Sequence, residues 1–264
     1  MLTDAHCHPF DLASVFPAEE DERRRLGIIC AASASSLEEF EYCEQLPKTL
    51  PCFALHPQMP AIENNFEEKI DGHLDLLDML AGQGRLSAVG ETGFDFYNEA
   101  FRETEKLQER LFIAHLETAL RYGLPVVLHV RRAMNKVFAH SKILKKCNAV
   151  IFHSWSGTED EGLAVLRHGI NAYFSFGNAI MMNHKKAMRS CAYFPIDRLL
   201  SETDAPYQPL CGREFSVYAD LYDILGAIAS LRQKERGYRK CGSITGYEEM
   251  ENIIEINFKK AFLQ

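Results

Sequence analysis

Short apolar runs alternate along the chain with longer segments whose apolar residues recur at helical spacing. The short runs are rich in β-branched or other apolar residues, a pattern that predicts buried β-strands. The predicted strands cover residues 2–6, 27–32, 52–56, 87–91, 125–130, 149–153, 172–176 and 199–203.

The segments between these runs combine helical periodicity with residues that favour helices. They predict helices at residues 37–46, 66–80, 104–122, 132–145 and 159–168, and two more at 217–232 and 247–262 after the last strand. Gly123 and Gly169 follow two of these segments, as glycine commonly does where a helix ends. The charged run at 19–25 is interpreted as a solvated helix face or a loop.

Repeated strand–helix units indicate an α/β protein, and eight of them predict a single (β/α)8 barrel of the TIM type. A length of 264 residues would also suit two average domains. A doubly wound sheet would usually carry a glycine-rich loop after its first strand, and the sequence has none there. Because no linker or shift in composition marks a boundary, we expect one barrel domain over residues 1–264.

Composition narrows the class of protein. With 47% hydrophobic and 25% charged residues, the chain has the balance of an ordinary soluble globular protein. It shows no leader-like start and no apolar stretch long enough to cross a bilayer, so a cytoplasmic protein without membrane contact is expected. Its eight cysteines form no CxxC pair and are expected to be reduced. The net charge of −8 implies that any attraction to a polyanion is local.

Side chains typical of metal sites fall at the ends of five predicted strands. The carboxyl ends of barrel strands form the active face, so these side chains are expected to meet. His6 and His8 are two residues apart, and strand alternation points both to the same side. The candidates, whose imidazole and carboxylate groups suit divalent cations, are His6, His8, Glu91, His129, His153 and Asp204.

Each candidate taken alone has a plainer interpretation. A single histidine at a strand end, such as His129, is more often a structural residue than a ligand. Glu91 and Asp204 follow apolar strands, where a carboxylate needs an ion partner or a metal. Because so many such groups at one barrel mouth would leave polar atoms unpaired, the sequence predicts two bound cations.

Several segments together resemble the TatD-like deoxyribonucleases of the amidohydrolase superfamily. They are residues 4–8 (DAHCH), 55–57 (LHP), 88–95 (AVGETGFD), 124–129 (LPVVLH), 152–157 (FHSWSG), 200–207 (LSETDAPY) and 257–262 (NFKKAF). The resemblance spans most of the chain and implies hydrolysis of phosphodiester bonds in DNA. It also implies ligand roles: one ion on His6, His8 and Asp204, a second ion on His129 and His153, and Glu91 as the bridge between them.

The resemblance implies two divalent ions, of which Zn, Mg, Mn and Ni are all candidates. Asp204 and Glu91 are the expected catalytic residues, with Asp204 taking the proton of the attacking water. Asp4 and Glu202 are expected to orient metal ligands through contacts with them, without binding the ions themselves. Asp95 has two interpretations, as a helper of the site or as a residue of a turn.

Residues just beyond the strand ends are candidates for substrate contacts. His56 and Arg131 are the first choices. Trp155 and Tyr207 lie beside ligands, where they would either stack on a base or pack in the core. Further cations follow the fifth and seventh strands, with an exposed helix face as the alternative for the lysines: Arg132, Lys185, Lys186 and Arg189.

The sequence departs from the family's usual pattern in three loops. Gln58 stands where a second histidine is usual, Arg132 stands where an acidic residue is usual, and no Asn-Glu-Pro element appears around Arg213. These loops are expected to bind substrate, and the metal set is whole. Hydrolysis therefore follows from the sequence more directly than DNA as the substrate.

Two other functions remain open. One is a small-molecule amidohydrolase or phosphoesterase on the same site, which the negative net charge and the altered loops favour. The other is a non-catalytic metal-bound scaffold, against which the full ligand set and its proton acceptor argue. No segment indicates an obligate protein partner.

Overall fold

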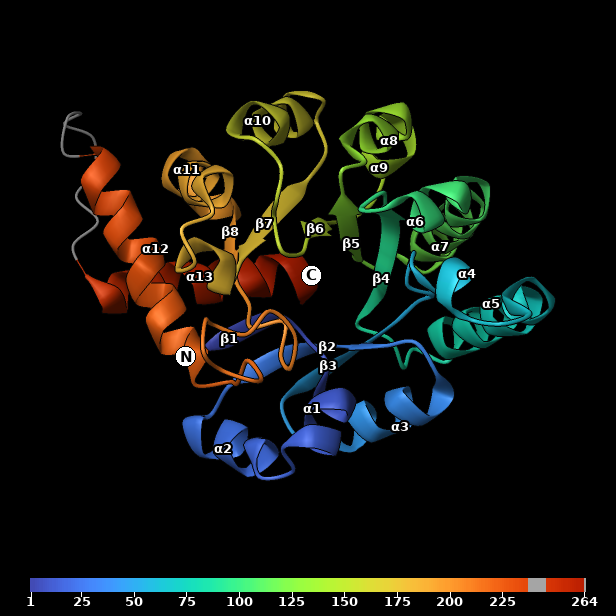
Figure 1. Cartoon of the computed structure of the whole chain (residues 1–264), viewed down its shortest axis with the longest axis horizontal. Helices are drawn as coiled ribbons and strands as arrows, with labels where there is room; N and C mark the ends of the chain where they lie inside the picture. The colour runs from blue at the N-terminus through green and yellow to red at the C-terminus, as the bar shows by residue number, and fades with distance from the viewer. Residues whose placement is uncertain (237–245, 264) are drawn as a thin grey trace.

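Parallel strands in chain order form the wall of a barrel, and helices surround it (Figure 1). The computed structural model describes residues 1–236 and 246–263, and within them the sheet has eight strands. They are β1 (Thr3–Cys7), β2 (Ile29–Ala34), β3 (Thr49–Phe53), β4 (Ala88–Asp95), β5 (Val126–Arg131), β6 (Val150–Phe152), β7 (Ala172–Phe176) and β8 (Leu199–Ser201). The Ser201 hydroxyl donates to the carbonyl oxygen of Thr3 (2.8 Å), which joins β8 to β1. The predicted barrel class is confirmed.

The helices lie outside the strands, and some of them begin or end at residues typical of helix ends. They are α1 (Pro9–Val15), α2 (Glu19–Leu26), α3 (Leu37–Gln45), α4 (Met59–Ile62), α5 (Phe66–Gly82), α6 (Glu99–Glu103), α7 (Glu105–Tyr122), α8 (Met134–Ala139), α9 (Ser141–Leu144), α10 (Glu159–Arg167), α11 (Lys185–Tyr193), α12 (Asp220–Arg236) and α13 (Tyr247–Phe262). Ser36 and Thr158 cap the starts of α3 and α10. Gly123 and Gly169 adopt positive φ after α7 and α10, as predicted.

The last helix, α13, closes the amino-terminal end of the barrel. The Met1 amino group pairs with Glu251 (2.8 Å) and Glu255 (2.7 Å) of α13. Three residues of α13, Phe258, Ala261 and Phe262, pack against small and apolar residues of the strands, and Figure 1 shows α13 crossing the barrel. The carboxyl ends of the strands, where the predicted ligands lie, are at the other end.

Some predicted boundaries were wrong. The third strand begins and ends earlier than predicted and includes Pro51. Proline has no N–H to donate, but the carbonyl of Pro51 still accepts a hydrogen bond from Ser87 N–H (2.8 Å), so the strand runs through this residue. The fourth strand continues past Glu91 to Asp95, paired with β5. The helix predicted at 132–145 is two short helices, α8 and α9, which meet at His140.

The charged run at 19–25 forms α2, but it is only partly solvated. The Arg23 side chain is 1% exposed. Its guanidinium donates to the carbonyl oxygens of Ile28 (2.9 Å) and Pro47 (2.6 Å) and pairs with Glu20 (2.7 Å). The interpretation as a wholly solvated face was therefore wrong for Arg23, which ties α2 to the loops that flank β2 and β3.

Within residues 1–236 and 246–263, no helix has the length and apolar character needed to span a membrane. The cysteines of this part of the chain are free, and all of them but Cys211 are buried. Cys241 lies outside the described residues.

Candidate metal centre

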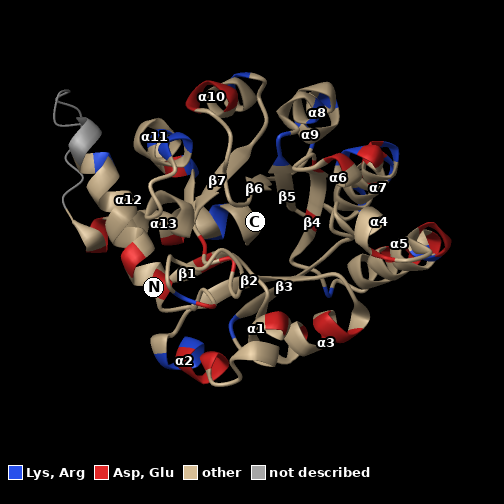
Figure 2. Cartoon of the chain, in the orientation of Figure 1, with Lys and Arg blue, Asp and Glu red and all other residues tan. Residues whose placement is uncertain are grey.

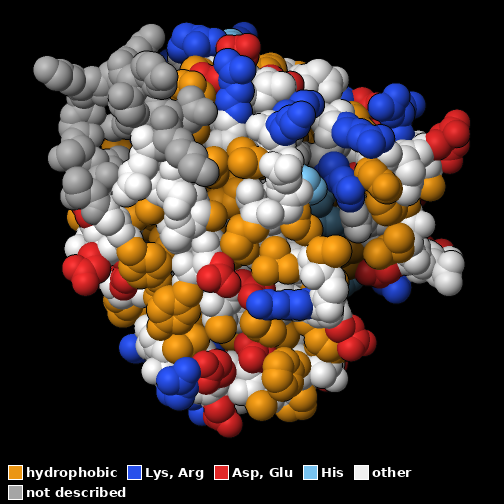
Figure 3. All heavy atoms as spheres, turned by 60° about the vertical axis from the view of Figure 1, so that its left-hand side comes forward, with side chains coloured by type: hydrophobic (Ala, Val, Ile, Leu, Met, Phe, Trp, Pro, Cys, Tyr) orange, Lys and Arg blue, Asp and Glu red, His pale blue; other side chains and the backbone are white. Residues whose placement is uncertain are grey.

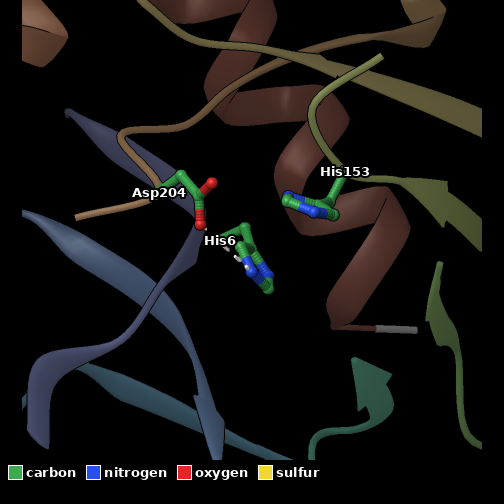
Figure 4. Close-up of side chains that lie close together, drawn as sticks. All are labelled: His6, His153 and Asp204. Carbon is green, nitrogen blue, oxygen red and sulfur yellow. Dashed lines mark ion pairs between the residues drawn. The ribbon is translucent and has the colours of Figure 1, made fainter. Parts of the chain in front are cut away.

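The side chains predicted as metal ligands converge at the carboxyl ends of the strands. His6 lies in β1 and His8 directly follows it, while His129 lies in β5 and His153 follows β6. Asp204 lies beyond the end of β8, and Figure 4 shows its carboxylate directed at His6, with His153 close by. Each of these side chains is buried or half-buried.

Glu91 stands between two groups of histidines and offers one carboxylate oxygen to each. Its Oε2 lies 3.1 Å from Nε2 of His6 and 3.8 Å from Nε2 of His8. Its Oε1 lies 2.7 Å from Nδ1 of His129 and 2.9 Å from Nε2 of His153. A carboxylate divided in this way has the geometry to bridge two cations.

An irregularity in β4 places Glu91 in this position. The pairing of β4 with β5 holds at Val89 and resumes at Thr92, but three steps on β4 match two on β5. Such a bulge re-aims the side chains beside it. Gly93 has a φ of 142°, and a Cβ there would collide with the carbonyl oxygen of His129. Glycine at this position therefore lets β4 bring Glu91 up to His129.

Asp95 holds His129 so that a lone pair faces Glu91. Nε2 of His129 lies 3.0 Å from Oδ2 of Asp95, so a neutral imidazole carries its proton on Nε2. Nδ1 then presents a lone pair to Oε1 of Glu91 at 2.7 Å, where two acceptors repel each other. A proton on Nδ1 or a bound cation removes the repulsion, and against burial the carboxylates of Asp95 and Glu91 do raise the pKa of His129. The donor set therefore fits a bound divalent ion.

Both interpretations of Asp95 hold in the structure. Its Oδ1 accepts the N–H of Tyr97 (2.7 Å), as a turn residue would. Its Oδ2 faces His129 and also accepts from Nε2 of Gln58 (2.7 Å). Gln58, one of the departures from the family pattern, thus contacts the residue that orients a predicted ligand.

His56 lies near the same histidines, but its hydrogen bonds indicate a different role. Its Nε2 is 3.3 Å from Oε1 of Glu91 and 3.3 Å from Nδ1 of His129. Its Nδ1 accepts the backbone N–H of Gln58 (3.2 Å), so the neutral ring carries its proton on Nε2. A protonated Nε2 has no lone pair for a metal. His56 is therefore placed as a hydrogen-bond donor toward the site.

Glu202 is fixed behind His153. Its Oε1 accepts from Ser154 N–H (2.7 Å), its Oε2 accepts from the Ser175 hydroxyl (2.6 Å), and Oε1 lies 3.5 Å from Nδ1 of His153. Burial by itself would lower the pKa of His153, but the carboxylates of Glu91 and Glu202 raise that pKa well above its ordinary value. Burial by itself would raise the pKa of Glu91, but the surrounding histidines, His153 and His56 first, hold that pKa well below its usual range.

Asp4 acts through the backbone. Its carboxylate accepts from the N–H of His6 (3.2 Å), and from the N–H (3.0 Å) and hydroxyl (2.6 Å) of Thr203. Asp204 follows in the left-handed region, with a φ of 57°, which Asp adopts more readily than most residues. Its Oδ1 lies 3.6 Å from Nε2 of His6 and 3.5 Å from Nε2 of His8.

Gln208 contacts the site although sequence reasoning did not identify it. Its Nε2 donates to Oδ2 of Asp204 (2.6 Å) and to the hydroxyl of Ser154 (2.7 Å). These bonds hold the outer oxygen of Asp204 while Oδ1 faces the histidines. An amide four residues after Asp204 carries no sequence signal by which this role could have been found.

A cavity of about 980 Å³ opens over the ligand cluster. Figure 3 shows histidine side chains within a hollow that has Lys and Arg side chains beside it. Arg131, Lys185 and Lys186 line the cavity, as expected for phosphate contacts. Arg189 and Arg213 are instead paired, Arg189 with Glu159 (2.7 Å) and Arg213 with an aspartate of α12.

The two aromatic candidates differ in exposure. Trp155 is 4% exposed, packs among Phe152, Phe174 and Phe194, and donates from Nε1 to a serine hydroxyl of α11. Trp155 therefore packs in the core, with only a small part of it at the cavity wall. Tyr207 is 49% exposed at the cavity, with its ring edge against His8 at 5.0 Å between centroids. Tyr207 thus remains accessible to a substrate.

Known proteins resemble most of the chain. Residues 3–263 match the family model described as TatD related DNase. An uncharacterized metal-dependent hydrolase of Buchnera aphidicola subsp. Baizongia pistaciae is 31% identical over 252 residues, which cover 88% of each chain. The 3'-5' ssDNA/RNA exonuclease TatD of Musicola paradisiaca is 38% identical over 130 residues, or 48% of each chain.

A solved structure shows the same fold. The TatD homologue YJJV of Escherichia coli K12 superposes with a TM-score of 0.82 over 100% of this chain and 98% of its own. The two sequences are 23% identical, so this likeness concerns the fold alone.

Proposed function

The chain belongs to the TatD related DNase family, and we propose that it cleaves phosphodiester bonds of single-stranded nucleic acid with two bound divalent ions. The prediction of a metal-dependent hydrolase of this family is confirmed. The observation that carries the proposal is Glu91, whose two oxygens face two separate groups of histidines. The name of the Musicola relative, which includes both ssDNA and RNA, supports this substrate class.

We assign the histidine ligands by their distances to Glu91, and Asp204 by its distances to His6 and His8. His6, His8 and Asp204 would hold one ion, and His129 and His153 the other, with Glu91 between them. When bound, such a pair acidifies a water molecule and stabilises negative charge on the phosphate and the leaving oxygen. The identity of the metal, whether Zn, Mg, Mn or Ni, is for metal analysis to decide.

Side chains of the chain itself perform the remaining tasks. Asp204 is the proton acceptor, and Gln208 holds its Oδ2 so that Oδ1 faces the site. His56 lines the cavity, and its Nε2 would donate a hydrogen bond to a phosphate bound there. Arg131 and Lys185, on the cavity wall, offset the charge of the phosphate backbone.

We also propose that residues 1–264 form one domain and that the protein is cytoplasmic. The pairing of Met1 with Glu251 and Glu255 supports a single domain, because it joins the first residue to the last helix. The free cysteines of the described residues agree with a reducing compartment.

The test couples metal analysis to hydrolysis. Purified protein should bind two equivalents of divalent metal, lose activity on a single-stranded oligonucleotide in a chelator, and regain it with Mn, Mg or Zn. Simple phosphodiester and amide esters serve as competing substrates. Full activity in protein shown to be metal-free would refute the proposal, and turnover confined to an amide ester would favour the small-molecule alternative.

A further inference from the structure

Two guanidinium groups lie against the ring of an exposed tyrosine, and one of them belongs to Arg131, which lines the cavity. Tyr97, just beyond β4, is 46% exposed. The guanidinium carbon of Arg131 lies 3.8 Å from the centre of its ring, and that of Arg132 lies 4.9 Å from it. Arg132 also donates to the carbonyl oxygen of Tyr97 (2.8 Å). We call Tyr97, Arg131 and Arg132 the Tyr97 platform.

The two arginines are brought together against the usual geometry of a strand. Successive side chains on a strand point to opposite faces, yet residues 131 and 132 both reach the same ring. Arg132 has a φ of 56°, in the left-handed region, which breaks the alternation at the end of β5. Both side chains are exposed, and within residues 1–236 and 246–263 neither forms an ion pair with a carboxylate. The platform thus combines two positive charges that no carboxylate neutralises with the flat ring of Tyr97 and two flat guanidinium groups.

The platform is connected to the metal-ligand cluster. Tyr97 N–H donates to Asp95, and Asp95 faces His129, so the platform follows directly from the strand that holds Glu91. Arg131 also lines the cavity, so the platform continues the cavity outward.

Charge on the cavity walls gives the direction in which a polyanion would leave the site. The side toward α1 and α3 contributes Asp11 and Glu39, and Glu63 lines the same cavity. The side toward β5 and α11 contributes Arg131 and Lys185. Figure 2 shows this separation, with acidic residues on α1 and α3 and basic residues on α11 and at the end of β5. A phosphate backbone is repelled from the first side and attracted to the second.

We propose that the Tyr97 platform is a subsite for the nucleotide next to the scissile phosphate of a single strand. The base stacks on the flat groups of the platform, which are the Tyr97 ring and the arginine guanidinium groups, and the adjoining phosphate pairs with Arg132. Bases in a duplex are already stacked and paired, so the subsite selects single strands and has little sequence preference. This inference rests on the proposed function.

The test compares two substrates on the metal-loaded enzyme: a single-stranded decanucleotide, and bis(p-nitrophenyl) phosphate, which has neither a nucleobase nor a second phosphate. Tyr97→Leu and Arg132→Gln should each lower the ratio of kcat/KM for the decanucleotide to kcat/KM for the small ester by about tenfold, the scale of one lost stacking contact. Arg132→Gln should also reduce the salt dependence of decanucleotide binding, measured by fluorescence anisotropy, by about one phosphate contact.

Matched controls separate binding from folding. Tyr97→Phe keeps the ring, and Arg167→Gln removes an exposed arginine of α10 that does not line the cavity, so both should keep the wild-type ratio. An equal loss on both substrates, or an unchanged ratio in Tyr97→Leu and Arg132→Gln, would overturn the subsite while leaving the proposed function intact. A wild-type enzyme that cleaves neither substrate would instead refute the proposed function, and the subsite with it.

Discussion

We propose two roles for Asp204, because its Oδ1 faces His6 and His8 and its charge would let it accept a proton. Asn fits its left-handed backbone and keeps one oxygen, but it cannot accept that proton. Asp204→Asn should therefore lower kcat by about two orders of magnitude or more. Single-turnover rates, measured together with metal content, check this. Near wild-type turnover with both metals bound would show that another group is the base.

Gln208 provides a second prediction at the residue scale. Gln208→Leu removes the donor to Oδ2 of Asp204 and to Ser154, so the carboxylate is free to rotate. Loss of such a supporting hydrogen bond typically costs about 10- to 100-fold in metal affinity or activity. Competition with a metal-binding dye and steady-state kinetics measure both quantities. If kcat and metal affinity both stay at wild-type values, Gln208 does not position Asp204.

At the scale of the element, α13 provides stability at the end of the barrel away from the chemistry. Phe258 is 1% exposed and packs inside the barrel end, whereas Ile256 on the same helix is 50% exposed. Phe258→Ala should lower the free energy of unfolding by about 3–5 kcal/mol, the usual range for a buried Phe. Ile256→Ala should change it by no more than about 0.5 kcal/mol. Urea denaturation compares the two, and similar losses would contradict the assignment.

Over the whole molecule, stability should depend on pH through His115, which joins α7 to β4 and to the loop after β3. Its Nε2 accepts from Leu55 N–H (3.4 Å), and its Nδ1 donates to the Thr92 hydroxyl (2.6 Å). Burial lowers the pKa of His115 to about 3, against 6.5 when exposed. The unfolded chain therefore takes up the proton first, so stability is full above pH 6.5 and falls as the pH drops toward 3.

The part of the slope of unfolding free energy against pH that is due to His115 should approach about 1.4 kcal/mol per pH unit below pH 6. Other histidines also titrate in this range, so the comparison is with His115→Gln, whose amide has both a donor and an acceptor. The variant should lose this part of the slope in urea denaturation series at several pH values. Parallel pH profiles for the two proteins would show that His115 is not the group responsible.

The sequence by itself determined the order of strands and helices, the barrel class and the chemistry of the ligand set. These follow from local patterns, because strand alternation places His6 beside His8 and strand ends of a parallel barrel must meet at one face. The predicted strand boundaries were wrong where pairing with a neighbouring strand outweighed the local preference of a residue, as at Pro51 in β3. Arginine is usually exposed, so exposure was expected for Arg23. Its burial depends on carbonyl groups elsewhere in the chain that accept its hydrogen bonds.

Only the tertiary structure decided what each group in the site faces. The division of Glu91 between two groups of histidines depends on the bulge in β4, and the proton on His129 depends on Asp95. The partners that orient the site are distant in sequence: Gln58 and Asp95 are 37 residues apart, and Ser154 and Gln208 are 54 apart. Hydrogen bonds act over about 3 Å, so they depend on how the loops fold over the strand ends, which no local pattern encodes.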